Sequence, residues 1–180
     1  MMMNSIQAVF IDRDGTIGGN DQAIFPGEFE MYPYVEKALE QLRSSGLKIY
    51  ALTNQPGVSR GEVNKEDFEI ELKKFGFDKI YLCPHEQLEG CRCRKPSPGM
   101  LMAAAKENDL DLRKCMVIGD RWTDMLAADL AGCMKILVKT GAGMNEYQKY
   151  KNAEFFGRWA EVSPNYIAED LRDAVNWIMK

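Results

Sequence analysis

The sequence has one histidine, no strong excess of either charge and no long apolar run. Lys and Arg number 23 and Asp and Glu 27, so the formal net charge is -4. This balance gives no electrostatic reason to expect nucleic acid or an anionic membrane as partner. No apolar run approaches the length of a transmembrane helix. Residues 1–5 lack the charged and apolar regions of a signal peptide, and we expect a cytoplasmic protein.

The sequence contains only five cysteines, an odd number. Three of the five cysteines lie within eleven residues, which fits an extracellular disulfide framework poorly. A reduced compartment with a metal site fits better. The length of 180 residues suggests one domain, residues 1–180, and we expect a monomer. There is no internal repeat and no low-complexity linker.

Short apolar runs alternate with helical patterns along the chain. Strands are expected at residues 6–11, 47–53, 79–83, 116–118 and 134–139. Helices are expected at residues 34–45, 64–75, 98–108, 123–131 and 168–179. The alternation predicts an α/β fold, a three-layer Rossmann-like sandwich with a central parallel sheet. Ligands of such folds bind beyond the carboxyl ends of the strands, so polar residues there are candidate site residues.

Two aspartates follow the first expected strand. Asp12 and Asp14 are two residues apart, so strand periodicity puts both carboxylates on one side with Arg13 pointing away. One of them could serve as a nucleophile or metal ligand and the other as a general acid/base. By itself, the motif is equally well explained as a turn that closes a strand.

Polar residues also stand at the next strand end and before a later helix. Thr53 and Asn54 end the second strand and can donate to phosphate oxygens without adding charge. Lys95 precedes a helix start, where it can neutralise phosphate as a compact point charge. Each feature taken singly also has an ordinary interpretation, a strand-end turn or a solvated basic run.

The fourth expected strand ends in a further aspartate. Asp120 is well placed to complete a magnesium site with Asp12, because Mg²⁺ prefers carboxylate and water oxygens. Asp124 lies in the first turn of the next helix and could orient Lys95 or support the metal ligands. If none of these features were catalytic, four unrelated turns would have to place such polar residues at one edge of the sheet by chance. The expected convergence of the four segments therefore favours a catalytic site.

Four segments together resemble the motifs of haloacid dehalogenase superfamily phosphatases, in the same order. They are residues 10–17 (FIDRDGTI), 52–55 (LTNQ), 94–100 (RKPSPGM) and 119–124 (GDRWTD). The resemblance implies that Asp12 attacks phosphorus and forms an aspartyl phosphate. It implies that Asp14 protonates the leaving alcohol and then activates the hydrolytic water.

The resemblance also assigns the ligand contacts. Mg²⁺ would be held by Asp12, Asp120 and the backbone carbonyl of Asp14. The residues expected to bind the substrate's phosphate are Thr53, Asn54, Arg94 and Lys95. Arg94, with Arg60 and Arg121, is a candidate for the rest of the substrate.

The substrate implied by the resemblance is a small phosphorylated metabolite. Within the superfamily, the sequence is similar to phosphatases of a heptose bisphosphate and of histidinol phosphate, and we favour the sugar bisphosphate. The alternatives are a phosphotransferase or phosphonatase with the same nucleophile, and a non-catalytic zinc-stabilised interaction module.

A separate set of metal ligands lies at residues 83–93. Cys83, His85, Cys91 and Cys93 make up a complete tetrahedral zinc set, and no other histidine competes for the fourth position. Four protein ligands leave no open position, so this Zn²⁺ should be structural. The alternative is three buried cysteines beside a surface histidine. The other two cysteines, at positions 115 and 133, are expected in the core.

The spacing of the motifs leaves no room for a cap domain. One loop, one helix and one strand use the stretch from Asp14 to Thr53. A helix, a strand and the zinc loop use the stretch from Thr53 to Lys95. We therefore expect an open site, with residues 18–29, residues 57–61 and the zinc loop as its walls.

Overall fold

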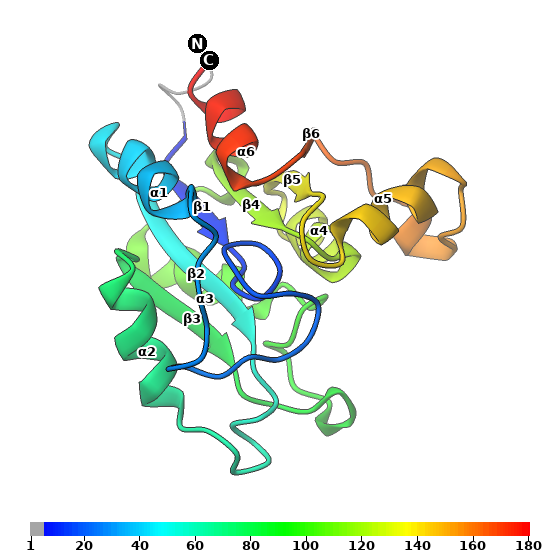
Figure 1. Ribbon diagram of the computed structural model, residues 1–180. Helices are drawn as coiled ribbons and strands as arrows, with labels where there is room; N and C mark the ends of the chain where they lie inside the picture. The colour runs from blue at the N-terminus through cyan, green and yellow to red at the C-terminus, as the bar shows by residue number, and fades with distance from the viewer. Residues whose placement is uncertain (1–5) are drawn as a thin grey trace.

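Six parallel strands form one sheet in the order β3-β2-β1-β4-β5-β6 (Figure 1). This computed structural model describes residues 6–180, so the segment 1–5 that was considered as a signal peptide lies outside the described residues. The strands are β1 Ala8–Ile11, β2 Lys48–Asn54, β3 Lys79–Cys83, β4 Cys115–Gly119, β5 Met134–Val138 and β6 Tyr166–Ala168. Every residue of β1 is buried, as expected for a central parallel strand.

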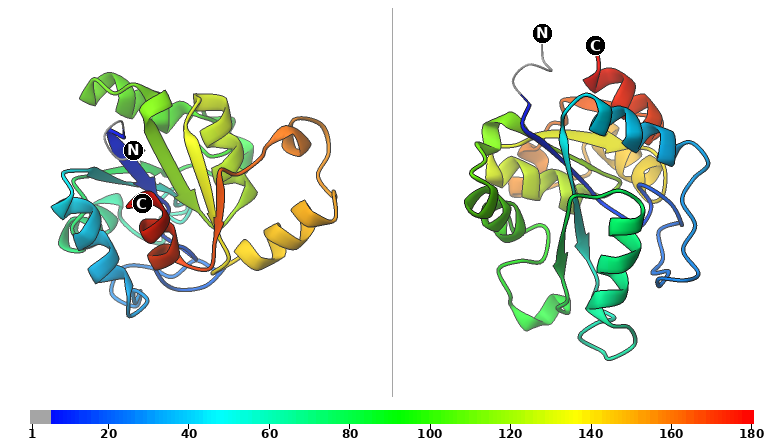
Figure 2. Two further views of the ribbon diagram at one scale, coloured as in Figure 1. Left: turned by 90° about the horizontal axis from the view of Figure 1, so that it is seen from above. Right: turned by 90° about the vertical axis from the view of Figure 1, so that its left-hand side faces the viewer.

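Helices cover both faces of the sheet. One face carries α1 Val35–Ser44, α2 Lys65–Lys74 and α6 Leu171–Ile178, and the other carries α3 Gly99–Asn108 and α4 Trp122–Ala131. Alternate residues of β1 divide between the two cores: Val9 packs with the first set of helices and Phe10 with the second. The left view of Figure 2 shows α1 and α6 on the side of the sheet opposite α3 and α4. The predicted three-layer sandwich is confirmed.

The helices on the first face follow the expected amphipathic spacing. The buried positions of α1 are Val35, Ala38, Leu39 and Leu42. This i, i+3, i+4, i+7 pattern puts one apolar stripe against the sheet. The tail helix α6 repeats the pattern and is capped by Asp170, whose carboxylate accepts from the Asp173 amide at 2.9 Å. Trp177 and Ile178 pack on this core.

The tail holds two elements that the sequence reading missed, α5 Gly143–Lys151 and β6. The helix expected at 168–179 begins only at Leu171, because Ala168 belongs to β6. Aromatic contacts attach the segment around α5 to α4. Trp122 stacks on Phe155, with ring centres 4.4 Å apart.

The segments that could have held a cap belong to the core fold. Within residues 6–180, only α1 lies between β1 and β2 as a helix. Between β2 and β4 are α2, β3, α3 and the short 3₁₀ turns η2 Gln87–Glu89 and η3 Leu112–Lys114, and a further turn, η4 Gly157–Glu161, follows α5. No helix in this part of the chain combines the length and apolar character needed to cross a membrane.

Candidate active site

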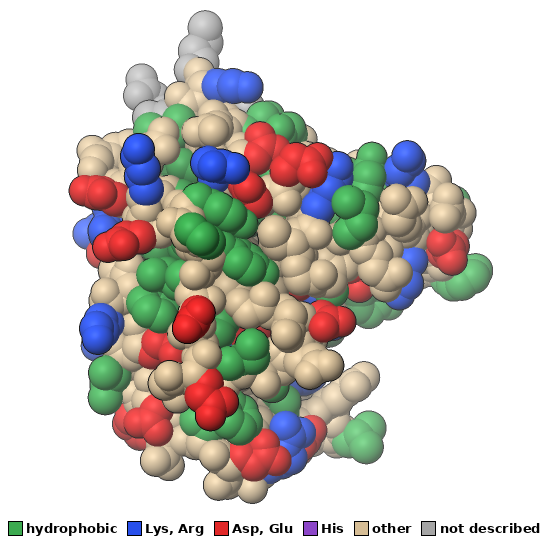
Figure 3. Space-filling model, in the orientation of Figure 1, with side chains coloured by type: hydrophobic (Ala, Val, Ile, Leu, Met, Phe, Trp, Pro, Cys, Tyr) green, Lys and Arg blue, Asp and Glu red, His purple; other side chains and the backbone are tan. Residues whose placement is uncertain are grey.

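Strand register brings the polar segments to one edge of the sheet. Ile11 of β1 is aligned with Ala51 of β2 and with Ile118 of β4. The residues that follow these positions therefore meet at a cavity of about 330 Å³. Its lining comprises Asp12, Asp14, Asp21, Gln22, Ala23, Asn54, Gln55, Pro56, Arg94, Lys95, Arg121, Thr123 and Asp124. In Figure 3, the surface is hollowed on the right, between the arm that carries α5 and the lower loops.

Lys95 is a buried cation at the floor of this cavity. Its Nζ donates to Asp12 Oδ1 at 3.0 Å, to Asp124 Oδ1 at 2.6 Å and to the carbonyl oxygen of Leu52 at 2.7 Å. All three ammonium protons are therefore used. Burial lowers the pKa of Lys95, but the charges of the two aspartates outweigh this and raise it above its ordinary value. Lys95 is thus a fixed positive charge beside Asp12.

Asp124 is held at the start of α4. Its Oδ2 accepts from the backbone amide of Arg121 at 3.1 Å, while Oδ1 accepts from Lys95. Burial and the neighbouring charge of Asp12 raise the pKa of Asp124 to about 6. The hydrogen bond from Lys95 to Asp124 is the contact expected of a residue that orients Lys95.

Asp120 is fully buried behind Asp12. Its Oδ2 accepts from the Ala142 amide at 2.9 Å, and its Oδ1 lies 3.3 Å from the Thr16 hydroxyl. Among residues 6–180, no Lys or Arg side chain pairs with it. Burial, followed by the charges of Asp12 and Asp124, raises the pKa of Asp120 to about 9. An ionised Asp120 would thus need a cation close by.

The three aspartates form a group suited to a metal ion. Asp12, Asp120 and Asp124 each offer an oxygen, and these oxygens lie within 4.8 Å of one another. Lys95 alone cannot balance three buried carboxylates. A divalent cation that prefers oxygen would remove the excess negative charge, so the donor set fits Mg²⁺. The side chain of Asp14 is outside this group.

Asp14 faces the cavity with one donor on each oxygen. Oδ1 accepts from Arg13 Nη1 at 2.6 Å, and Oδ2 accepts from Gln55 Nε2 at 2.6 Å. Burial raises the pKa of Asp14, and Arg13 only partly offsets this. A carboxyl group at the cavity surface whose pKa is raised above its ordinary value is suited to general acid work. Arg13 lies outside the cavity, as expected, but its guanidinium turns back to Asp14.

The segment after β2 supplies a residue that sequence reasoning missed. Gln55 Nε2 also donates to Thr53 Oγ1 at 2.9 Å, and Thr53 is buried without lining the cavity. Asn54 makes two hydrogen bonds with the backbone of Lys95, at 3.0 and 3.1 Å. The Asn54 side chain thus holds Lys95 in place. Because Gln55 directly follows Asn54 at the strand end, its position in the sequence could have indicated that it belongs to the site.

Two of the three candidate arginines reach the cavity. Arg94 lines it, and its Nη1 donates to the carbonyl oxygen of His85 at 3.2 Å. Arg121 also lines it, and its Nη2 donates to the carbonyl oxygen of Asp21 at 2.7 Å. Each arginine retains further N–H groups that could meet an anionic ligand.

Arg60 lies elsewhere. Its guanidinium pairs with Glu62 at 3.0 Å and Glu86 at 2.8 Å on the surface, outside the cavity lining. The expected wall at residues 57–61 is likewise absent from the lining, whereas residues 21–23 of the other expected wall contribute to it. Glu62 and Glu86 thus pair with Arg60 away from the cavity.

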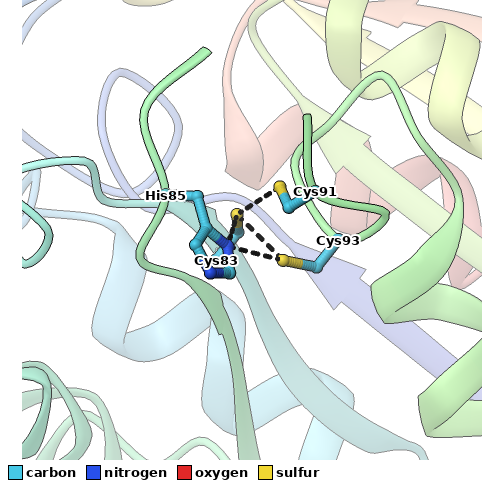
Figure 4. Close-up of side chains that lie close together, drawn as sticks. All are labelled: Cys83, His85, Cys91 and Cys93. Carbon is cyan, nitrogen blue, oxygen red and sulfur yellow. Dashed lines mark hydrogen bonds between the residues drawn. The ribbon is translucent and has the colours of Figure 1, made fainter. Parts of the chain in front are cut away.

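The four expected zinc ligands lie together at the end of β3 and in the loop that follows it, with their side chains pointing toward one another (Figure 4). Cys83 Sγ lies 3.1 Å from Cys93 Sγ and 3.6 Å from Cys91 Sγ, and His85 Nδ1 lies 3.2 Å from Cys93 Sγ. A tetrahedron with Zn–S bonds of about 2.3 Å has edges of about 3.8 Å, close to these separations. Burial raises the pKa of the Cys83 thiol, so a thiolate there needs a cation. The group could hold a metal ion.

A parallel α/β sheet with clustered carboxylates and a buried lysine at its carboxyl edge defines a Rossmann-like hydrolase. The chain belongs to the haloacid dehalogenase-like hydrolase family, whose model matches residues 18–132. A second model, described as HAD-hydrolase-like, matches residues 92–174. The chain is accordingly an enzyme, a phosphatase of this family.

Similar proteins carry consistent names. The chain is 35% identical to a D-glycero-beta-D-manno-heptose-1,7-bisphosphate 7-phosphatase of Photorhabdus laumondii, over 96% of this chain and 95% of that protein. It is 34% identical to an alpha-heptose counterpart from the same organism, over 81% and 90%. A crystal structure of the D,D-heptose 1,7-bisphosphate phosphatase of B. bronchiseptica, complexed with magnesium and phosphate, superimposes with a TM-score of 0.82 at 28% identity. That match covers 97% of this chain and 98% of the other.

Proposed function

We propose that this chain is a magnesium-dependent phosphomonoester hydrolase that removes phosphate from a heptose 1,7-bisphosphate through an aspartyl phosphate on Asp12. The observation that carries the proposal is the group of Asp12, Asp120 and Lys95 beside a cavity that Asp12, Lys95 and Asp14 line. The substrate follows from the names of the relatives. Histidinol phosphate is the competing substrate.

Asp12 has one oxygen available for attack. Oδ1 is held by Lys95, whereas Oδ2 has only a long contact of 3.4 Å with the Thr16 hydroxyl. Oδ2 forms a bond to phosphorus while the bond from phosphorus to the sugar oxygen breaks. Asp14 gives its proton to that oxygen, and the sugar leaves as an alcohol.

Hydrolysis of the aspartyl phosphate reverses the role of Asp14. The ionised carboxylate takes a proton from a water molecule, whose oxygen attacks phosphorus. The bond between phosphorus and Asp12 then breaks, which releases inorganic phosphate and restores Asp12. Because phosphoryl transfer depends on positioning and charge neutralisation, a bound Mg²⁺ would supply most of the remaining stabilisation of phosphate charge.

Each remaining residue has a place in this proposal. Asp12 and Asp120, with the backbone carbonyl of Asp14, would hold Mg²⁺, while Asp124 keeps Lys95 in position. Asn54, Arg94 and Lys95 line the cavity and are proposed to bind the phosphate of the substrate, whereas Thr53 does not line it and would support this site through Gln55. Arg94 and Arg121 both bring positive charge to the cavity, which suits the second phosphate of a bisphosphate.

We also propose that the Cys/His group holds a structural Zn²⁺ that braces the loop before Lys95. Its four side chains fill a tetrahedral set and leave no open coordination position. Five unpaired thiols fit a reducing cytoplasm. The single sheet that runs through residues 6–180 supports one phosphatase domain, and we propose that it acts as a monomer.

The proposal is tested by phosphate release from α- and β-heptose 1,7-bisphosphate and from histidinol phosphate, with and without Mg²⁺. We expect turnover of a heptose bisphosphate that requires Mg²⁺ and falls more than about 10⁴-fold in Asp12→Asn, as is usual for loss of a nucleophile. A higher kcat/KM for histidinol phosphate would reject the substrate. Equal rates for wild type and Asp12→Asn would reject the catalytic site and favour a non-catalytic module.

A further inference from the structure

Arg13 is a buried cation to which the proposed chemistry gives no task. Its side chain is fully buried behind Asp14 and does not line the cavity. The guanidinium carbon lies 3.8 Å from the ring centre of Phe29 and 4.9 Å from that of Phe68. Burying a guanidinium between aromatic rings is unfavourable unless the charge is paired. Its partners therefore indicate what it does.

The guanidinium of Arg13 joins three parts of the molecule. Nη1 donates to Asp14 Oδ1 at 2.6 Å and to the carbonyl oxygen of Ile24 at 2.7 Å, in the loop next to the cavity wall. Nε donates to Glu71 Oε1 at 2.8 Å, on α2 and 58 residues away. Nη2 finds no acceptor among residues 6–180. These three hydrogen bonds therefore fix how the group is turned.

Glu71 is the fixed end of this arrangement. Its side chain is 9% exposed and belongs to a regular helix, whereas Asp14 and Ile24 belong to loop segments. Asp14 receives a second donor, Gln55, on its other oxygen. The carboxyl plane of Asp14 is thus set between Arg13 on one side and Gln55 on the other.

We propose that the Arg13–Glu71 pair is a positioning device for the acid/base residue: Glu71 holds the Arg13 guanidinium, and Arg13 holds Asp14 toward the leaving oxygen. Glu71 does not line the cavity and acts only through Arg13, so it is a positioning residue. The inference rests on the proposed function, because it takes Asp14 to be the general acid. If the Asp14 carboxyl group is displaced by a fraction of an ångström, it is no longer aligned with the leaving oxygen, although the substrate still binds.

The chemistry of the leaving group separates this role from a merely structural one. A sugar alkoxide must be protonated as it leaves, whereas 4-nitrophenolate leaves readily without a proton. General acid catalysis contributes about 10²- to 10⁴-fold, so we expect Glu71→Ala to lower kcat/KM for heptose bisphosphate about 10-fold. For 4-nitrophenyl phosphate the decrease should be less than about 3-fold, because little acid catalysis is there to lose. The ratio of the two values in one preparation does not depend on how much of the enzyme is folded.

Two variants serve as controls. Glu71→Gln keeps an oxygen that accepts from Arg13 Nε, and it should return the ratio to within about 2-fold of wild type because the geometry persists. Glu69→Ala removes an exposed carboxylate from the same helix. The Glu69 carboxylate lies 3.8 Å from Lys65 Nζ and does not contact Arg13, so its loss should leave the ratio unchanged.

The possible outcomes distinguish this inference from the proposed function. An unchanged ratio in Glu71→Ala, with wild type active in Mg²⁺, overturns the positioning role and leaves the phosphatase proposal standing. The same change of ratio in Glu69→Ala also overturns it. Retention of activity toward both substrates in Asp12→Asn would instead reject the proposed function.

Discussion

The two candidate metal sites of this molecule differ in how the chain builds them. The thiolate and imidazole ligands come from one loop, within eleven residues of sequence. The carboxylates come from the ends of β1 and β4 and from the start of α4, and Asp12 and Asp120 are 108 positions apart. The loop site can form once its own turn forms, whereas the carboxylate site exists only when the whole sheet has assembled.

The sites also differ in charge and in what their metal would do. The Cys/His group offers four ligands and no open position, so a metal bound there would stabilise the fold. The buried carboxylates carry more negative charge than Lys95 can balance, so the metal-free fold is strained electrostatically there. Loss of the first metal should therefore cost stability, and loss of the second should mainly cost activity.

The largest effect on stability is expected for Cys93→Ala. Loss of one thiolate should release Zn²⁺ and lower the free energy of unfolding by more than about 2 kcal/mol, because loss of a metal is among the causes of large destabilisation. Metal analysis and thermal unfolding would measure both changes. Cys133→Ala is the control, because Cys133 is buried in the same core but is not one of the four grouped ligands, and its loss should leave the zinc content unchanged. Less than half an equivalent of zinc in wild type would contradict the assignment.

The next prediction concerns Gly15, whose backbone lies close to the Asp120 carboxylate. Gly15 and Gly132 both have φ of +82°, so Ala imposes the same backbone strain of about 1 kcal/mol at either position. A Cβ on Gly15 would lie 2.1 Å from Asp120 Oδ2, whereas one on Gly132 meets nothing within 4 Å. Gly15→Ala should therefore destabilise by about 1–2 kcal/mol more than Gly132→Ala and weaken Mg²⁺ binding about 10-fold. Equal Mg²⁺ affinities by calorimetry would show that Asp120 is not a ligand.

A third effect is a pH dependence of stabilisation by Mg²⁺. The pKa of Asp120 rises from its ordinary 3.8 to about 9 in the metal-free fold. Because the folded state binds this proton more tightly, stability from Asp120 is fully present below pH 3.8 and is lost as pH rises toward 9. Mg²⁺ must displace the proton, so its binding should stabilise by up to about 2.7 kcal/mol more at pH 8 than at pH 6, about 1.4 kcal/mol for each pH unit. Thermal unfolding in both buffers measures this, and Asp120→Asn should remove the difference.

The contrast between the sites also explains what the sequence could predict. The spacing of Cys83, His85, Cys91 and Cys93 predicted their grouping directly, because the ligands are local. The carboxylate site required the additional rule that parallel strands end at one edge of the sheet. That rule brings Asp12, Asp120 and Lys95 together, and in the structure their side chains lie close to one another. The family resemblance then supplied the order of the motifs.

The features that were missed depend on tertiary packing. The expected strands and helices up to residue 139 differ from the structure by at most about two residues at each end. β6 has only three residues, too few for a periodic pattern, and only Gly143 of α5 is buried. The inward course of Arg13 could not be read from strand alternation, because its position is decided by Phe29 and Glu71 from other elements.

The most direct test of the account is the covalent intermediate itself. Enzyme with Mg²⁺ and ³²P-labelled heptose bisphosphate is quenched in acid within the first turnover, and the phosphorylated peptide is identified by mass spectrometry. We predict one phosphoryl group on Asp12. Label on another residue, or continued phosphate release without any label on Asp12, would contradict the account.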